Sequence, residues 1–113
     1  MAKAKLVRDE VPSILIRQGL NPSYRALSFH DHNRYDHLRD KLLEVSGEAA
    51  LAVKTGNPEH VLVSLGSLLE VMGVVAAQYR LNLNDVRDER DRKRKVKGGY
   101  TKFYILDEEN RRL

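Results

Sequence analysis

Three carboxylates recur at helical spacing in the first half of the chain. Asp40, Glu44 and Glu48 are each four residues apart, so their side chains lie along one stripe if this part of the chain is helical. Mg²⁺ prefers oxygen ligands of this kind and keeps several of its own waters. The stripe also fits a solvated helix face, because the neighbouring bases Arg39 and Lys41 can pair with these acids. The spacing alone therefore leaves a metal site and a solvated face open.

A further carboxylate, Glu70, lies in the apolar stretch SLGSLLEVMG at residues 64–73. A buried carboxylate destabilises a fold unless it is hydrogen-bonded, ion-paired or bound to a metal. The chain offers many arginines as partners, so a salt bridge and a metal ligand are equally open at this position. The serines of the same stretch, Ser64 and Ser67, have no His or Asp partner nearby in the chain and so carry no nucleophile signature. Small residues of this kind also suit close helix packing.

Basic residues gather near both ends of the chain, in KLVRDE and in KRKVKGGY. The four bases of interest are Lys5, Arg8, Arg94 and Lys97. Short strands are expected over residues 3–7 and 100–106, and these bases converge if the two strands pair. Such a cluster suits a polyphosphate through charge-assisted hydrogen bonds. The alternative is a set of unrelated surface bases.

The composition fits one small domain over residues 1–113, with a flexible tail from about residue 107. The chain has no cysteine, which excludes disulfides, a thiol nucleophile and thiolate metal ligands. No run of about 18 apolar residues is present, so no membrane span is predicted. The opening MAKAKLVRDE lacks the apolar core of a secretory signal, and we therefore expect a cytoplasmic location.

A short helix and a long one are expected in the first half of the chain. Pro12 suits the first turn of the short helix, which Gly19 ends. Residues 32–54 contain no proline, and their apolar residues recur at about 100° per residue. The apolar face comprises Leu38, Leu42, Val45, Ala49, Ala52 and Val53. The histidines are His30, His32, His37 and His60. The HDH triplet at residues 30–32 lies in a loop-like segment without a partner motif, which argues against a metal site there.

The apolar stretch after the loop KTGNPEH is expected to form a long helix over residues 58–81. Gly56 suits the end of the preceding helix, Asn57 suits an N-cap, and Pro58 suits a first helical turn. The long helix is apolar almost all round, and such a helix is covered on most sides by its own chain or by a partner subunit. We therefore expect a homo-oligomer, with a dimer as the simplest closed arrangement.

A charged segment, RDERDRKRKVK at residues 87–97, follows the apolar helix. It holds seven of the 20 Lys and Arg of a chain whose formal net charge is +4. Either Asn82 or Asn84 can cap this third long helix, which Gly98 and Gly99 end. A basic segment of this kind binds phosphate groups on nucleotides or nucleic acid. The interleaved acids fit a solvated helix end equally well.

The stretch KLVRDEVPSIL resembles the N-terminal signature of a subgroup of the MazG-like, all-α nucleoside triphosphate pyrophosphohydrolases, the phosphoribosyl-ATP pyrophosphohydrolase-like subgroup. The later segments are similar in order: KLLE, a loop, LLEVM, a charged helix and GGY. The resemblance covers almost the whole chain. It implies a mainly α, MazG-like helical bundle with short terminal strands. It also implies Mg²⁺-dependent hydrolysis of a nucleotide to a monophosphate and pyrophosphate.

The metal-binding pattern of that family is only partly present. The family places acids as E-E-x-x-E on one helix and E-x-x-D on the next. Glu44 and Glu48 match the first motif, and Glu70 matches a family acid just after the second. The three positions where this chain lacks the acid are Val45, Ser64 and Ser67. The resemblance therefore assigns Glu44, Glu48 and Glu70 to a Mg²⁺ site that is weak or absent.

Three hypotheses on function follow from the sequence. The first is a pyrophosphohydrolase homologue that is weakened or inactive, with substrate phosphate bound by basic side chains. Those side chains are Lys5, Arg8, Lys41, Arg94 and Lys97. The second is a non-catalytic protein, a pseudoenzyme, that binds a nucleotide or another protein. The third is a small basic nucleic-acid-binding protein that uses residues 87–97, which is disfavoured because no recognition motif is present.

Overall fold

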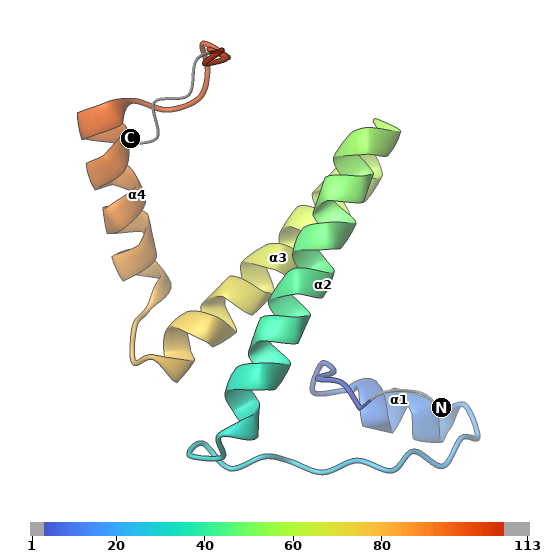
Figure 1. The fold of residues 1–113 in the computed structure, drawn as a ribbon. Helices are drawn as coiled ribbons and strands as arrows, with labels where there is room; N and C mark the ends of the chain where they lie inside the picture. The colour runs from blue at the N-terminus through green and yellow to red at the C-terminus, as the bar shows by residue number, and fades with distance from the viewer. Residues whose placement is uncertain (1–3, 108–113) are drawn as a thin grey trace.

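The computed structural model describes residues 4–107 and is mainly helical, as the sequence predicts (Figure 1). Its helices are α1 (Val11–Arg17), α2 (Asn33–Thr55), α3 (Pro58–Gln78) and α4 (Leu83–Lys97). α2 and α3 pack against each other as a hairpin, and α4 diverges from α3 so that the two form a V. α1 lies apart, near the end of the hairpin where α2 begins. The radius of gyration of 18.0 Å reflects this open arrangement.

The hairpin forms because each long helix has one stripe of side chains that the other covers. On α2 the buried residues Leu38, Val45 and Ala52 are seven residues apart, which places them on one face after every two turns. Val53, which was expected on this face, is 68% exposed because it lies one residue, about 100°, away from Ala52. On α3 the buried residues are Val71, Ala76 and Gln78. The core is therefore a narrow seam between two helices.

The turn that joins α2 to α3 follows the predicted chemistry. Gly56 ends α2 in the left-handed conformation, with φ of 73°, which glycine adopts without steric cost. The Asn57 side chain accepts hydrogen bonds from the backbone N–H groups of Glu59 and His60 and so caps α3. Pro58 occupies the first turn, where its missing N–H would have no helical partner.

α4 begins with a capping box formed by Asn82 and Asp85. The Asn82 side chain accepts from the Asp85 N–H at 3.0 Å, and the Asp85 carboxylate accepts from the Asn82 N–H at 2.9 Å. Of the two caps proposed from the sequence, Asn82 is the one used. Three bases lie in the last turn, where a positive charge is favourable beside the free carbonyl groups. No residue of α4 is buried.

α3 exposes a large apolar surface although it belongs to the hairpin. It is long and apolar enough to cross a membrane, with a mean hydropathy of 1.8 over an 18-residue window of which 11% is buried within the chain. One such helix is weak evidence for a membrane span, since helices of soluble proteins meet the same test. The exposed apolar side chains of α3 are Leu62, Val63, Leu65, Leu69 and Val74. Within residues 4–107, these side chains form an apolar surface on α3 that the rest of the chain leaves largely uncovered.

The prediction of short terminal strands is wrong for the residues that the structure describes. No strand occurs between residues 4 and 107, and the expected pairing partners end far apart because α4 carries residues 100–106 away from the N-terminal segment (Figure 1). An isolated strand leaves its backbone groups without ladder partners and has no stability of its own. The side chains of Tyr100 and Phe103 are 94% and 84% exposed. Lys3, at the start of the first expected strand, and the tail beyond residue 107 lie outside the described residues.

Arg80 closes α3 in a conformation that usually belongs to glycine. The helix ends at Gln78, earlier than the expected residue 81, because Arg80 adopts a φ of 60°. The backbone N–H groups of Arg80 and Leu81 donate to the carbonyl groups of Ala77 and Ala76, which is the hydrogen-bond pattern of a Schellman motif. The Arg80 guanidinium lies 5.7 Å from the centre of the Phe29 ring.

Replacing Arg80 with alanine is expected to lower the free energy of unfolding, whereas replacing it with glycine is not. Arg80→Ala removes a cation–π contact of about 0.5–1 kcal/mol and keeps the backbone strain. Arg80→Gly loses the same contact but relieves about 1–2 kcal/mol of left-handed strain, so its free energy of unfolding should equal or exceed that of the natural chain. Urea denaturation of the two variants measures the difference. An alanine variant as stable as the glycine variant would contradict this account.

Candidate functional site

A small hollow between the N-terminal segment and α2 brings several of the predicted site residues together. Its volume is about 220 Å³, and its lining residues are Ala4, Lys5, Leu6, His37, Asp40, Lys41 and Glu44. Two bases, two acids and one imidazole thus surround a space that also has apolar walls. A site with this mixture suits a ligand that carries both charged and apolar groups.

Lys41 and Glu44 form the closest ion pair of the hollow. The Lys41 Nζ atom donates to Glu44 Oε2 at 2.8 Å. This hydrogen bond, together with the positive charges of Lys41 and Lys5, holds the pKa of Glu44 below its ordinary value. Asp40 accepts a hydrogen bond from Arg39 at 3.2 Å. Asp40 and Glu44, two of the three acids of the stripe, are therefore each paired with a base of α2.

Removing the charge of Glu44 should lower the free energy of unfolding at neutral pH but not at low pH. The lowered pKa means that the stabilisation is present above the ordinary glutamate pKa and is lost as the pH falls through the lowered one. Because the Glu44 side chain is 40% exposed, Glu44→Gln should cost only about 0.5 kcal/mol or less. Urea unfolding of this variant at both pH values measures the cost. In the Lys41→Met background, Glu44→Gln should not change the free energy of unfolding. A loss of stability that persists in that background would contradict the assignment of the stabilisation to the Lys41–Glu44 pair.

The other predicted metal ligands lie away from the hollow. Glu48 and Glu70 are exposed, and neither lines it. Within residues 4–107, no three His, Cys, Asp or Glu side chains lie close enough together to hold a metal ion. The carboxylates of one chain therefore do not fit a Mg²⁺ site built from three protein ligands. The assignment of Glu44, Glu48 and Glu70 to a metal stays a prediction.

The three positions that lack the family acids lie along the contact between the two long helices. Val45 is 6% exposed and belongs to the buried stripe of α2. Ser64 and Ser67 are half-buried and lie on the same face of α3 as the buried Val71. A carboxylate at any of these positions would lose much of its hydration, which is costly without a partner cation. A valine and two serines instead allow the helices to pack directly.

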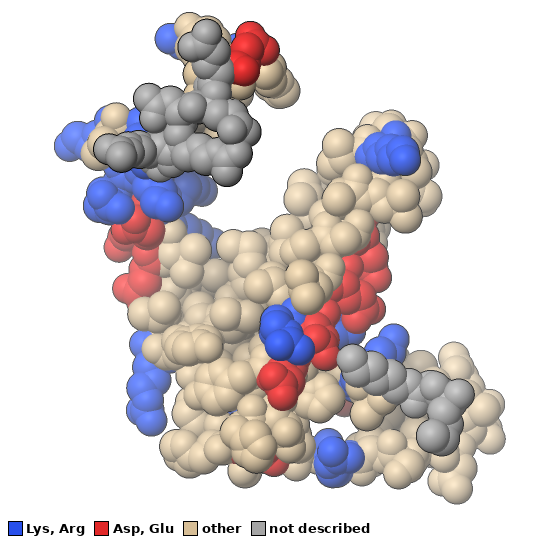
Figure 2. Space-filling view, in the orientation of Figure 1, with Lys and Arg blue, Asp and Glu red and all other residues tan. Residues whose placement is uncertain are grey.

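The predicted phosphate-binding bases divide into two groups. Lys5 and Lys41 both line the hollow. Arg8 is exposed just before α1 and does not line it. Arg94 and Lys97 belong to the last turn of α4, which lies on the opposite side of the molecule from the N-terminal segment (Figure 1). Figure 2 shows basic side chains gathered on α4 with acidic ones beside them, and further charged side chains of both signs along the hairpin. One chain thus brings together two of the five bases.

A buried polar cluster beside the hairpin was not predicted from the sequence. Arg34 donates to the Gln78 side chain at 3.0 Å and to the Leu27 carbonyl at 2.9 Å. Gln78, which is 7% exposed, donates to the Phe29 carbonyl at 3.1 Å. The sequence holds one signal for it, because Gln78 is a polar residue in an otherwise apolar helix end. The partners are far apart in sequence, so spacing alone could not connect them.

The fold and the hollow define a small, mainly α protein with a charged pocket between its N-terminal segment and its central helix. No family model matches the chain, and no solved structure matches it. Phosphoribosyl-ATP pyrophosphatases from three strains of Neisseria meningitidis, of serogroups A, B and C, are 28% identical to it over 86 residues. The alignments cover 76% of this chain and 80% of each relative. The chain is therefore distantly similar to these phosphoribosyl-ATP pyrophosphatases.

Proposed function

We propose that this protein is a nucleotide pyrophosphohydrolase homologue that binds the polyphosphate of a nucleotide in the hollow between the N-terminal segment and α2. The observation that carries the proposal is the placement of Lys5 and Lys41 around this hollow in a chain distantly similar to phosphoribosyl-ATP pyrophosphatases. Ammonium groups bind phosphate oxygens through charge-assisted hydrogen bonds. In a working enzyme of this type, the reaction converts a nucleoside triphosphate to a monophosphate and pyrophosphate.

The hydrolysis is proposed to be weakened or lost, so that the protein binds a nucleotide more than it turns it over. Metal-assisted phosphoryl chemistry needs ions that neutralise the phosphate oxygens and activate a water. No group of three potential metal ligands occurs among residues 4–107, and Glu44 is engaged by Lys41, which supports this part of the proposal. The residues of this chain are therefore assigned to phosphate binding: the two lysines neutralise charge, and Leu6 supplies an apolar wall.

Calorimetry with a panel of nucleotides, with and without Mg²⁺, tests this proposal. We expect triphosphate binding that depends little on Mg²⁺. Lys5→Met and Lys41→Met should each weaken it at least about 10-fold, because each removes one charge-assisted contact of about 1.5–3 kcal/mol. Lys54→Met, in the last turn of α2 and away from the hollow, is the matched control and should bind normally. Absence of binding to every nucleotide would overturn the proposal.

Nucleic-acid binding through α4 has less support. Two arginines of this helix are engaged by acids of the same helix, in the pairs Arg90–Asp91 and Arg92–Glu89. The hydrogen bond from Arg92 also raises its pKa and lowers that of Glu89, so both groups stay ionised and paired. Interleaved charges of this kind reduce the net field that a phosphate backbone would meet.

We also propose that the protein is a homodimer in which α3 contributes the central contact. Leu62, Leu65 and Leu69 recur at helical spacing on the side of α3 that faces away from α2. They are 71%, 52% and 51% exposed in one chain. An apolar stripe of this length on a small protein is typical of an interaction site. A second copy supplies a matching stripe, as a two-fold axis requires.

A further inference from the structure

The N-terminal part of the chain carries Lys5 to the hollow but contacts the hairpin little. The backbone of α1 is not in contact with that of any other described helix, and none of its residues is buried. Hydrogen bonds close α1 at both ends, from the Val11 N–H to the Arg8 carbonyl and from the Leu20 N–H to the Leu15 carbonyl. Residues 8–20 therefore form a locally ordered unit. We call this unit, together with residues 4–7, the strap. The contacts that hold the strap over α2 must therefore act through the segment that follows the strap in the chain.

The buried polar cluster acts on this segment. Arg34, at the start of α2, and Gln78, at the end of α3, bind the backbone carbonyl groups of Leu27 and Phe29. Arg34 also donates to Gln78, so the two side chains join both helices of the hairpin to the loop. We call these two side chains and the carbonyl groups that they bind the clamp. No buried side-chain N or O atom of the described residues lacks a hydrogen-bond partner, so the clamp is fully satisfied.

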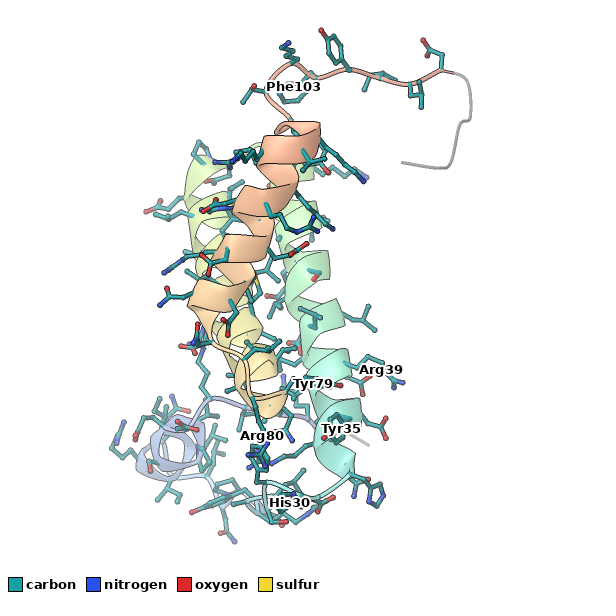
Figure 3. The ribbon with its side chains drawn as sticks, turned by 90° about the vertical axis from the view of Figure 1, so that its left-hand side faces the viewer. His30, Tyr35, Arg39, Tyr79, Arg80 and Phe103 are labelled. Atoms are coloured by element: carbon teal, nitrogen blue, oxygen red, sulfur yellow. The ribbon has the colours of Figure 1, made fainter. Side chains whose placement is uncertain are left out.

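The Phe29 ring reinforces the clamp. The guanidinium groups of Arg34 and Arg80 lie 5.4 Å and 5.7 Å from its centre, and the His30 ring meets it edge-on at 5.3 Å. Figure 3 shows His30 and Arg80 at the same end of the hairpin, beside Tyr35 and Tyr79. The loop is thus fixed through both its backbone and an aromatic side chain. The segment between the strap and the first clamped residue, which we call the free connector, is therefore limited to residues 21–26.

We infer that Arg34 and Gln78 are positioning residues for Lys5: by clamping the loop at Leu27 and Phe29 they shorten the tether that holds the strap at the hollow. Without the clamp, the free connector would run from residue 21 to residue 32, which doubles its length. The local concentration of a tethered group falls roughly as the −3/2 power of tether length, so doubling lowers it about threefold. The inference rests on the proposed function, because Lys5 is taken to bind phosphate.

The first test measures the position of the strap and needs no ligand. The chain has no cysteine, so Ser13→Cys in α1 and Ser46→Cys in α2 provide two unique sites for spin labels. Arg34→Met/Gln78→Leu, which removes every side-chain hydrogen bond of the clamp, should broaden the distance distribution between the labels. Arg87→Met, on exposed α4, is the control and should leave the distribution unchanged. An unchanged distribution in the double variant would overturn the inference whether or not any nucleotide binds.

The second test measures affinity for inorganic pyrophosphate by calorimetry. Arg34→Met/Gln78→Leu, which removes the whole clamp, should weaken binding about threefold, and the loss should disappear in the Lys5→Met background, because the clamp acts through Lys5. A loss that is the same in both backgrounds would indicate a merely structural role and overturn the inference. Inserting six Gly and Ser residues after Ser23, with the clamp intact, should reproduce the threefold loss and replaces the double variant if that variant does not fold. Absence of binding in the natural chain would refute the proposed function, and the spin-label result then decides the inference.

Discussion

The variant Val45→Glu/Ser64→Glu/Ser67→Asp is expected to hydrolyse nucleoside triphosphates with Mg²⁺ at least about 100-fold faster than the natural chain. Disturbing even one residue that supports a metal ligand costs about 10–100-fold in metal affinity or activity, and this variant places acids at all three positions where the resembled pattern has them. The natural chain keeps Glu44 and Glu48 close by in sequence on α2. Release of pyrophosphate, measured for both proteins under the same conditions, gives the ratio.

The same variant should depend on the metal for its stability. The three new carboxylates lie at the contact between α2 and α3, where Val45 is buried and both serines are half-buried. Without a cation their desolvation and mutual repulsion should destabilise the hairpin by several kcal/mol. A metal at 100 times its Kd stabilises a folded state by about 2.7 kcal/mol, which for a chain of this size raises Tm by at least about 5 °C. The Tm of the natural chain should hardly respond to Mg²⁺.

A control variant separates the effect of the new negative charges from the effect of the larger side chains. Val45→Gln/Ser64→Gln/Ser67→Asn introduces amides of almost the same size and should gain neither activity nor a response to Mg²⁺. If the triple acid variant does not fold, Ser64→Glu/Ser67→Asp keeps the buried Val45 and should show a smaller gain in both measurements. The proposal of weakened hydrolysis is wrong if the natural chain already turns over a triphosphate at ordinary enzymatic rates, about 1–10³ s⁻¹.

The second large effect is expected at the apolar stripe of α3. The natural chain should be a dimer at micromolar concentration, and Leu62→Glu/Leu69→Lys should weaken the dimer at least about 100-fold. Each leucine that becomes buried on association contributes about 1.5–3 kcal/mol, and each substitution acts on both subunits. The substituted residues are 71% and 51% exposed in one chain and face away from α2, so the hairpin itself should stay folded.

Light scattering and sedimentation equilibrium measure this effect. Ile16→Lys/Leu20→Glu changes two apolar residues that are similarly exposed, at 52% and 56%, but lie in the strap, and it should leave the dimer intact. A natural chain that is monomeric at micromolar concentration would refute the dimer. Binding of the natural chain to phospholipid vesicles instead of to itself would show that the exposed face of α3 meets a membrane.

The sequence predicts the helices well because their ends are set by local chemistry. Gly56, Asn57 and Pro58 fix the turn between α2 and α3, and Asn82 fixes the start of α4, through contacts that span at most a few residues. The terminal strands were predicted from a loose alternation of side chains and from the family resemblance, and their pairing depended on where α4 places the end of the chain. The direction in which α4 leaves the hairpin is not encoded in local sequence patterns.

The candidate site likewise combines contacts that follow from local sequence with contacts that do not. Lys41 and Glu44 are three residues apart on one helix, so their pairing follows from helical geometry. That Lys5 joins them depends on the course of the strap. The strand pairing expected from the sequence would have brought Lys5 to Arg94 and Lys97 instead. The bond between Arg34 and Gln78 joins residues 44 positions apart, and neither residue type is distinctive enough to reveal it. The three missing acids are visible in the sequence only beside the family pattern.

The open V of the structure has a consequence for how the stability of this protein behaves. A compact chain of this length has a radius of gyration of about 13 Å, whereas this one measures 18.0 Å, and its described part buries five apolar side chains. In the proposed dimer, each subunit would bury further apolar surface of α3 against its copy, so association would add to the stability of the folded hairpin. The melting temperature should then rise with protein concentration, because mass action favours the folded, associated state.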